Sequence, residues 1–339
     1  MDLEQEEMQF LGVFDILKEA YKIILTCRKI FSQITLTLIF PLSLLILIHI
    51  EVSDILFRNI IHNQVDLVDT QVGTPKYNTL SRHISSEWTY LWLFKGLYFT
   101  FLLIFSLLST SAVVYTVASV YTARELSFKK VISVVPKVWK RLMITFLWTF
   151  LAFFLYNFLA LIILFIFAVI MVEYSFQSGL VMLVVWGLLY VAGNIYMSLI
   201  WQLASVVSVL EEVRGIQAMK KSKALIKGKM WTSIFLFGIL TVFSFLFQFT
   251  FQKLVVHGWS FGLFGRAAYG VVCLLVFVVL MLLGLVTQTI LYFVCKSYHH
   301  ENIDKSALSN HLEVYLLGEY VPLKTKDVQL QHFEVCENH

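Results

Sequence analysis

The chain has 339 residues, of which 59% are hydrophobic and 14% are charged, and its formal net charge is +4. Soluble domains average about 45–50% apolar and about 25% charged residues, so this composition excludes an ordinary soluble globular protein. A lipid bilayer solvates the excess apolar surface, and the composition therefore predicts an integral membrane protein.

Six apolar segments reach the length of about 20 residues that a helix needs to cross the hydrocarbon layer. In chain order they are Ile30–Ile50, Leu97–Val120, Leu142–Val172, Leu180–Leu210, Trp231–Phe251 and Tyr269–Val294. A polar string from Glu173 to Gly179 separates the third from the fourth, which favours six spans over five. Pro41 lies inside the first span and predicts a kink there. We expect an all-α fold, a polytopic membrane helical bundle of about six transmembrane helices.

Three regions follow from these segments. Residues 1–29 form an amphipathic N-terminal segment, residues 30–294 the six-span membrane domain, and residues 295–339 a polar tail. The longest connection runs from Glu51 to Lys95, between the first two spans, and ends in aromatic residues typical of a membrane interface. The remaining connections are short.

The distribution of basic residues predicts the orientation of the spans. Segments on one side of the predicted membrane, both termini included, hold 20 of the 26 Lys and Arg residues. Cytosolic loops carry an excess of Lys and Arg, so we expect an N-in/C-in protein of an endomembrane or the plasma membrane, with both termini cytosolic.

A basic, amphipathic stretch precedes each odd-numbered span. The first places Phe10, Phe14, Leu17, Tyr21 and Ile24 at helical spacing. The second does the same with apolar residues between Phe128 and Trp139, and the third runs from Arg214 to Lys229. We interpret this pattern as three units, each an interfacial cytosolic helix followed by two spans. Cytosolic entry points would be basic without any repeat, so the pattern also has that simpler explanation.

The second and fourth loops carry more positive charge than orientation requires. Juxtamembrane Lys and Arg each gain about 1 kcal/mol near anionic lipid. We therefore predict contact with anionic headgroups or with a cytosolic protein partner. The candidate residues are Arg124, Lys129, Lys130, Lys137, Lys140, Arg141, Arg214, Lys220, Lys221, Lys223, Lys227 and Lys229.

The spans contain neutral polar residues, but no Asp, Glu, Lys or Arg well away from their ends. Buried charges usually mark ion-coupled pumps, so their absence from the spans argues against that class. Asn157, Asn194, Gln202 and Gln288 are candidates for an intramembrane polar site. The simpler explanation is packing between helices through hydrogen bonds.

The sequence has none of the motifs expected of a catalytic or cofactor-dependent protein. It lacks a phosphate-binding glycine loop, a HExxH string and a GxSxG string. The side chains of His299, His300, Glu301 and Asp304 are a possible metal-binding group, but a solvated membrane-exit turn explains them better. We expect no cofactor, no metal and no enzymatic activity. The basic residues border apolar segments, which is unlike a nucleic-acid footprint.

The fourth loop resembles a known membrane module. Gly215, then a basic run containing Ser222, then Lys227-Gly228-Lys229, is similar to the signature of the glycerophosphoryl diester phosphodiesterase membrane domain. The tail strings Tyr298–Lys305 and Gly318–Leu323 resemble a plant family of six-span proteins of unsettled function. Some of its members are labelled polyadenylate-binding-protein-binding protein. The resemblance covers most of the chain.

What these resemblances imply is limited. The phosphodiesterase chemistry of the first family belongs to a separate soluble domain, and no stretch here is able to hold one. The label in the second implies a protein partner at cytosolic segments. We predict a non-enzymatic membrane scaffold or lipid-associated protein that uses its basic cytosolic loops. The alternative is a transporter or facilitator with a polar pathway between spans three, four and six.

Overall fold

The computed structural model describes residues 5–122, 127–173, 176–258 and 262–301. These residues form helices and short turns, with no strand among them. The α-helices are α1 (Gln5–Met8), α2 (Val13–Thr26), α3 (Arg28–Ile34), α4 (Phe40–Val68), α5 (Pro75–Tyr121), α6 (Phe128–Glu173), α7 (Phe176–Leu210), α8 (Ile216–Ile226), α9 (Met230–Phe251) and α10 (Leu263–Tyr298). Two π-helical turns, η1 (Thr35–Ile39) and η2 (Gln252–Val256), lie within these runs.

Six long apolar helical segments confirm the predicted number of spans. Each is long and apolar enough to cross a membrane, and together they are Arg28–Val68, Pro75–Tyr121, Phe128–Val169, Gly179–Leu210, Met230–Val256 and Phe264–Tyr298. All six predicted spans lie within or largely overlap these segments. These six segments indicate a multi-pass integral membrane protein.

Pro41 is accommodated by the π-helical turn that precedes it. A proline has no backbone N–H and its ring crowds the carbonyl one turn earlier. In the π-helical turn η1, an N–H bonds to the carbonyl five residues earlier instead of four. The N–H of Phe40 thus donates to the carbonyl of Thr35. This wider turn places the irregularity predicted for the first span immediately before Pro41.

The long connection between the first two spans is itself helical. The helices α4 and α5 continue through it, leaving only residues 69–74 as a turn. Thr74 caps α5 by accepting a hydrogen bond from the N–H of Tyr77, and Pro75 occupies the first turn, where its missing N–H costs nothing. The amide of Asn63 donates to both carboxylate oxygens of Glu87, at 2.8 and 2.9 Å, and ties the two helices together.

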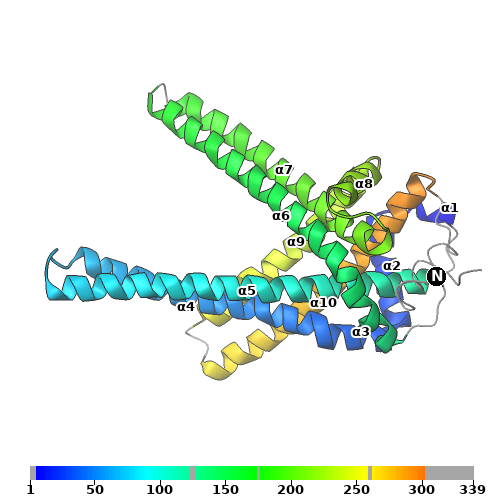
Figure 1. Cartoon of the computed structure of the whole chain (residues 1–339), viewed down its shortest axis with the longest axis horizontal. Coiled ribbons are helices and arrows are strands. Elements are labelled where there is room, and N and C mark those ends of the chain that lie inside the picture. Colours follow the sequence, from blue (N-terminus) through cyan, green and yellow to red (C-terminus); the bar gives the residue numbers. More distant parts are fainter. Residues whose placement is uncertain (1–4, 123–126, 174–175, 259–261, 302–339) are drawn as a thin grey trace, which may run out of the picture.

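Three helical hairpins meet at one end of the molecule and diverge at the other. Figure 1 shows the α4–α5 hairpin, the α6–α7 hairpin and the α9–α10 pair spreading away from a common base, where α2 and α8 also lie. Each hairpin corresponds to one of the three sequence units. The tip of the α6–α7 hairpin stays apart from the other two pairs, whereas α4 contacts the α9–α10 pair through an ion pair of 3.6 Å between Glu51 and Arg266.

The hydrophobic core lies at the common base. Many of its buried residues come from the ends of α5, α7 and α10, and these include Val114, Ala118, Leu203, Val207 and Ile290. Small residues in the second half of α5, such as Ser111, Ala112 and Ala118, are buried and let neighbouring helices approach closely. Towards the tips, side chains such as Phe158 and Leu188 are exposed, as expected of surfaces solvated by lipid.

The three amphipathic stretches take different forms. The first is the separate helix α2, and the third contains the separate helix α8. The second is not a separate helix, because α6 continues through it from Phe128 and keeps Pro136 within the helix. Its Val131, Val134 and Val138 are buried in the core, which holds these first turns in line with the span.

Candidate functional site

The loop that follows α7 builds the short helix α8, and its first glycine is required by geometry. Gly215 has φ of +60°, which side chains rarely tolerate, and an added Cβ would lie 2.8 Å from Cδ1 of Trp148 on α6. Its N–H donates to the hydroxyl of Thr145 at 2.8 Å. The chain is thus pinned against α6 at the point where α8 begins.

The other two signature positions in this loop also have structural roles. Ser222 is fully buried and donates a hydrogen bond to the carbonyl of Ile200 on α7, at 2.8 Å. Gly228 has φ of +101°, and an added Cβ would overlap the ring of Tyr298 on α10. Glycine, serine and glycine therefore dock α8 against three different helices.

A cluster of charged and polar groups fastens α8 to the ends of α7 and α10. The carboxylate of Glu211 lies 2.7 Å from Nζ of Lys221 and accepts a hydrogen bond of 2.6 Å from the hydroxyl of Tyr292. Lys296 approaches the same carboxylate at 3.5 Å, and Lys221 also reaches Glu301 at 3.5 Å. We call Glu211, Lys221, Tyr292, Lys296 and Glu301 the docking cluster.

The docking cluster shifts the pKa values of its central pair. Burial by itself would raise the pKa of Glu211, but hydrogen bonds from Lys221 and Tyr292 and the charge of Lys296 bring that pKa below its ordinary value. Burial opposes the charge on Lys221, yet its bonds to Glu211 and Glu301 hold the pKa of the lysine above its ordinary value. Both groups are therefore charged at neutral pH.

An apolar groove of about 410 Å³ lies between α8 and the α6–α7 hairpin. We call it the α8 groove. Trp148 and Leu155 from α6, Met197 and Ile200 from α7, and Met219 from α8 belong to its walls. Lys220 and Lys223 line its edge, and both side chains are exposed. Within the described part of the chain, neither lysine has an ion-pair partner.

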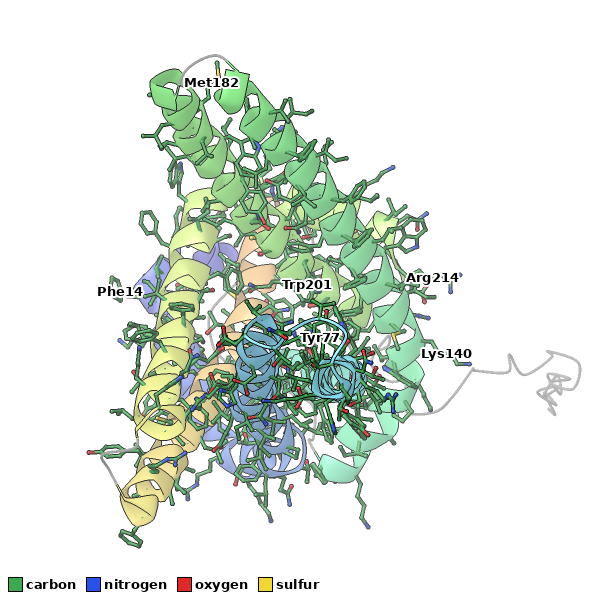
Figure 2. The ribbon with its side chains drawn as sticks, turned by 90° about the vertical axis from the view of Figure 1, so that its left-hand side faces the viewer. Phe14, Tyr77, Lys140, Met182, Trp201 and Arg214 are labelled. Carbon is green, nitrogen blue, oxygen red and sulfur yellow. The ribbon has the colours of Figure 1, made fainter. Side chains whose placement is uncertain are left out.

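The predicted basic residues do not form one continuous patch. Arg124 lies outside the described residues. Lys221 belongs to the docking cluster, and Lys229 lies 5.6 Å from the ring centre of Tyr298. Figure 2 places Lys140 and Arg214 on the same side of the molecule. The predicted residues with exposed side chains are Lys129, Lys130, Lys137, Lys140, Arg214, Lys220, Lys223 and Lys227, whereas Arg141 is half-buried.

The four residues predicted for an intramembrane polar site separate into two groups. Asn157 on α6 accepts a hydrogen bond of 2.6 Å from the hydroxyl of Tyr190, whose carbonyl accepts one of 3.0 Å from Asn194. Gln288 on α10 instead donates to the carbonyl of Gln202 at 2.5 Å and to Ser205 at 2.6 Å. Eight residues of α7, about 12 Å of helix, separate Asn194 from Gln202. The contacts of Asn157 and Gln288 join neighbouring helices, as expected for packing, whereas that of Asn194 lies within α7.

The turn after α10 also serves packing. The ring of His299 lies 3.1 Å from the carbonyl oxygen of Leu225, at the end of α8. Among the described residues, no group of three His, Cys, Asp or Glu side chains is arranged to hold a metal ion.

The apolar walls of the α8 groove were not predicted from the sequence. The signal present was weak, since Ile216 and Met219 follow helical spacing within the basic run and mark one apolar face of α8. The facing residues on α6 and α7 look like any other lipid-facing positions of a span. Only the placement of α8 across the hairpin distinguishes them.

Comparison with known proteins gives a family without an assigned activity. A family model described as Domain of unknown function (DUF8558) matches residues 1–333. No curated protein and no solved structure matches this chain. Because the family model covers nearly the whole sequence, the chain belongs to the DUF8558 family.

Proposed function

We propose that this chain is a non-enzymatic, lipid-associated membrane protein that holds an anionic phospholipid in the α8 groove. An acyl chain would lie along the apolar walls formed by Trp148, Leu155 and Met197. The phosphate would meet Lys220 and Lys223 at the edge. The observation that carries the proposal is this combination of an apolar groove and two unpaired lysines on one rigidly docked helix.

The energetics distinguish this groove from ordinary lipid solvation. Any phospholipid fills an apolar groove, because burying apolar surface contributes about 25 cal/mol per Å² regardless of the headgroup. The two lysines add about 1 kcal/mol each for an anionic headgroup over a zwitterionic one. A difference of about 2 kcal/mol corresponds to a preference of roughly thirtyfold.

The proposed orientation places α8 on the cytosolic side, with both termini. Support comes from the 20 Lys and Arg residues that border this side in the sequence. The anionic leaflet of a cell membrane faces the cytosol, where Lys220 and Lys223 would meet it. A similarity to the glycerophosphoryl diester phosphodiesterase membrane domain is part of the same proposal, because its signature residues Gly215, Ser222 and Gly228 are the ones that position α8.

We also propose that α2 is an interfacial helix on this side. It buries Ile16, Ala20 and Ile23 against the bundle and leaves Phe14 and Tyr21 exposed, at 81% and 62%. Figure 2 shows Phe14 at the edge of the molecule opposite Lys140 and Arg214. Exposed aromatic rings beside lysines are typical of a helix whose outer face enters the headgroup region.

Native mass spectrometry of the full chain in lipid-preserving particles tests the groove. We expect the wild type to retain anionic phospholipid at a higher fraction than the surrounding membrane does. K220Q/K223Q should lower that enrichment by about tenfold or more, because both headgroup charges are gone. The matched control K140Q/K227Q removes two exposed lysines that do not line the groove and should keep the enrichment.

A groove-filling variant distinguishes the contribution of the lipid acyl chain from that of the headgroup. A152F places a ring among the apolar walls and should reduce retention of anionic and zwitterionic phospholipids alike. Equal enrichment in the wild type and K220Q/K223Q, or no bound lipid above the surrounding membrane, would overturn the proposal.

A further inference from the structure

A second basic site lies at the start of α3, apart from the α8 groove. Arg28 and Lys29 of α3 and Lys129 of α6 line one hollow of about 670 Å³, together with the polar side chains of Thr26, Gln33 and Ser127. We call this the three-cation hollow. It shares no lining residue with the α8 groove.

The fold brings these charges together from distant parts of the sequence. The helix α2 ends when the N–H of Cys27 donates to the carbonyl of Ile23, and the chain then turns and begins α3 at Arg28. Phe31, one turn later, is buried and anchors α3 in the core. The basic pair is thereby held at the base of the first span.

On the other side of the hollow, Lys129 lies in the first turn of α6. The next turn is anchored by Val131 and Val134, which are 0% and 1% exposed. The helices α3 and α6 contact each other directly. The backbones that carry the three cations are therefore fixed on both sides before any ligand arrives.

The electrostatics of the hollow favour an anion. All three basic side chains are exposed, and none has an ion-pair partner within the described part of the chain. No carboxylate lines its described wall. Three like charges facing one concave space repel one another, and that repulsion is relieved when an anion binds among them.

The size and donor set indicate which kind of anion. A hollow of about 670 Å³ falls in the usual range for small-molecule sites, about 300–1,000 Å³, and is larger than one phosphate group needs. Arginine grips phosphate through two parallel N–H bonds, whereas lysine acts as a point charge. One arginine and two lysines thus suit a compact organic anion with two or more phosphate groups.

We propose that the three-cation hollow binds a multiply phosphorylated headgroup or its soluble equivalent. The shared chemistry is a small polyol ring that carries several phosphates. The hollow borders the first and third spans, where a lipid headgroup would lie. A soluble phosphate compound would reach the same space from the aqueous side. This proposal stands independently of lipid binding in the α8 groove.

Two binding experiments on the full chain in nanodiscs separate the two sources. In the first, soluble inositol trisphosphate is titrated onto protein in pure phosphatidylcholine discs by calorimetry. In the second, phosphatidylinositol bisphosphate is included in the discs and its retention is measured by native mass spectrometry. Binding in both arms identifies the phosphate-bearing ring as sufficient, and retention in the second alone identifies the membrane lipid as the source.

The variants decide whether the hollow is the site. R28Q/K29Q/K129Q should weaken the observed binding by roughly a hundredfold, at about 1 kcal/mol for each lost cation. K130Q/K140Q/K227Q removes the same charge from exposed lysines outside the hollow and should change binding by less than about threefold. R28K/K29R/K129R, which keeps three cations, should restore most of it.

The two proposals fail separately. K220Q/K223Q should leave binding of soluble inositol trisphosphate intact, because those lysines lie outside the hollow. The lipid arm is run in the K220Q/K223Q background, so that anionic lipid held in the α8 groove does not contribute to the measured retention. Binding of neither probe by the wild type would overturn the three-cation hollow, as would equal losses in the triple variant and its matched control. An unchanged thermal midpoint and an unchanged elution volume show that R28Q/K29Q/K129Q is folded.

Discussion

At the scale of single residues, the informative positions are glycines whose conformation is fixed by tertiary contacts. Gly215 combines φ of +60° with an approach to Trp148 that leaves no room for a methyl group. We expect G215A to destabilise the protein by about 2–5 kcal/mol, from backbone strain of about 1–2 and overpacking of about 1–3. Thermal or denaturant unfolding in nanodiscs measures the change.

A second glycine supplies the matched control for this prediction. Gly73, in the turn between α4 and α5, has φ of +90° but nothing within 4 Å of an added Cβ. G73A should therefore cost only the backbone term, about 1–2 kcal/mol. Equal losses in G73A and G215A would mean that contact with Trp148 contributes nothing.

At the scale of elements, the docking of α8 depends on charge and therefore on pH. The lowered pKa of Glu211 means that its contribution is present above the ordinary value of 4.5 and is lost as pH falls through the lowered pKa. The raised pKa of Lys221 means that its contribution is present below 10.5 and is lost as pH rises through the raised pKa. We expect E211Q to lose about 1–2 kcal/mol at neutral pH, since the pair is partly exposed to solvent.

The pH profile separates the ion pair from a general effect of the substitution. The difference in thermal stability between the wild type and E211Q should shrink on acidification below the lowered pKa of Glu211, where the wild-type carboxyl is also neutral. D69N, at an exposed aspartate in the turn after α4, should match the wild type throughout. A difference between E211Q and the wild type that persists unchanged into acid would contradict this account.

At the scale of the whole molecule, three hairpins share one base and diverge beyond it (Figure 1). The α4–α5 hairpin continues past the predicted first and second spans, and its 47-residue helix α5 is about 70 Å long at 1.5 Å per residue. That length exceeds a hydrocarbon layer of about 30 Å, so we expect the hairpin tip to project from the far side of the membrane.

Cysteine labelling in sealed, oriented vesicles tests this topology. In a background without native cysteines, N78C at the hairpin tip should react with a membrane-impermeant maleimide added to the non-cytosolic side. K140C, on the proposed cytosolic side, should react only after the vesicles are opened. Labelling of K140C but not N78C before the vesicles are opened would overturn the orientation. Labelling of both positions from one side would contradict a membrane crossing by α5.

The sequence by itself determined the membrane class and the number of spans. Both depend on how many consecutive apolar side chains a helix needs to stay in lipid, which is a local property of the chain. The ends of the helices were predicted less well than their number. The second span was predicted to begin at Leu97, whereas α5 begins at Pro75. Asn63 and Glu87 are polar and were predicted to lie in a loop. In the structure they belong to α4 and α5, and their hydrogen bonds hold these two helices together beyond the apolar region.

Only the tertiary structure decided which basic residues lie together and what they face. Lys220 and Lys221 are neighbours in sequence, yet one borders an apolar groove and the other belongs to the docking cluster. Arg28 and Lys129 meet in one hollow because α3 packs against the start of α6. Charge patterns along a chain predict sidedness, whereas a binding site depends on distances between segments far apart in sequence, and those distances are set by the packing of helices.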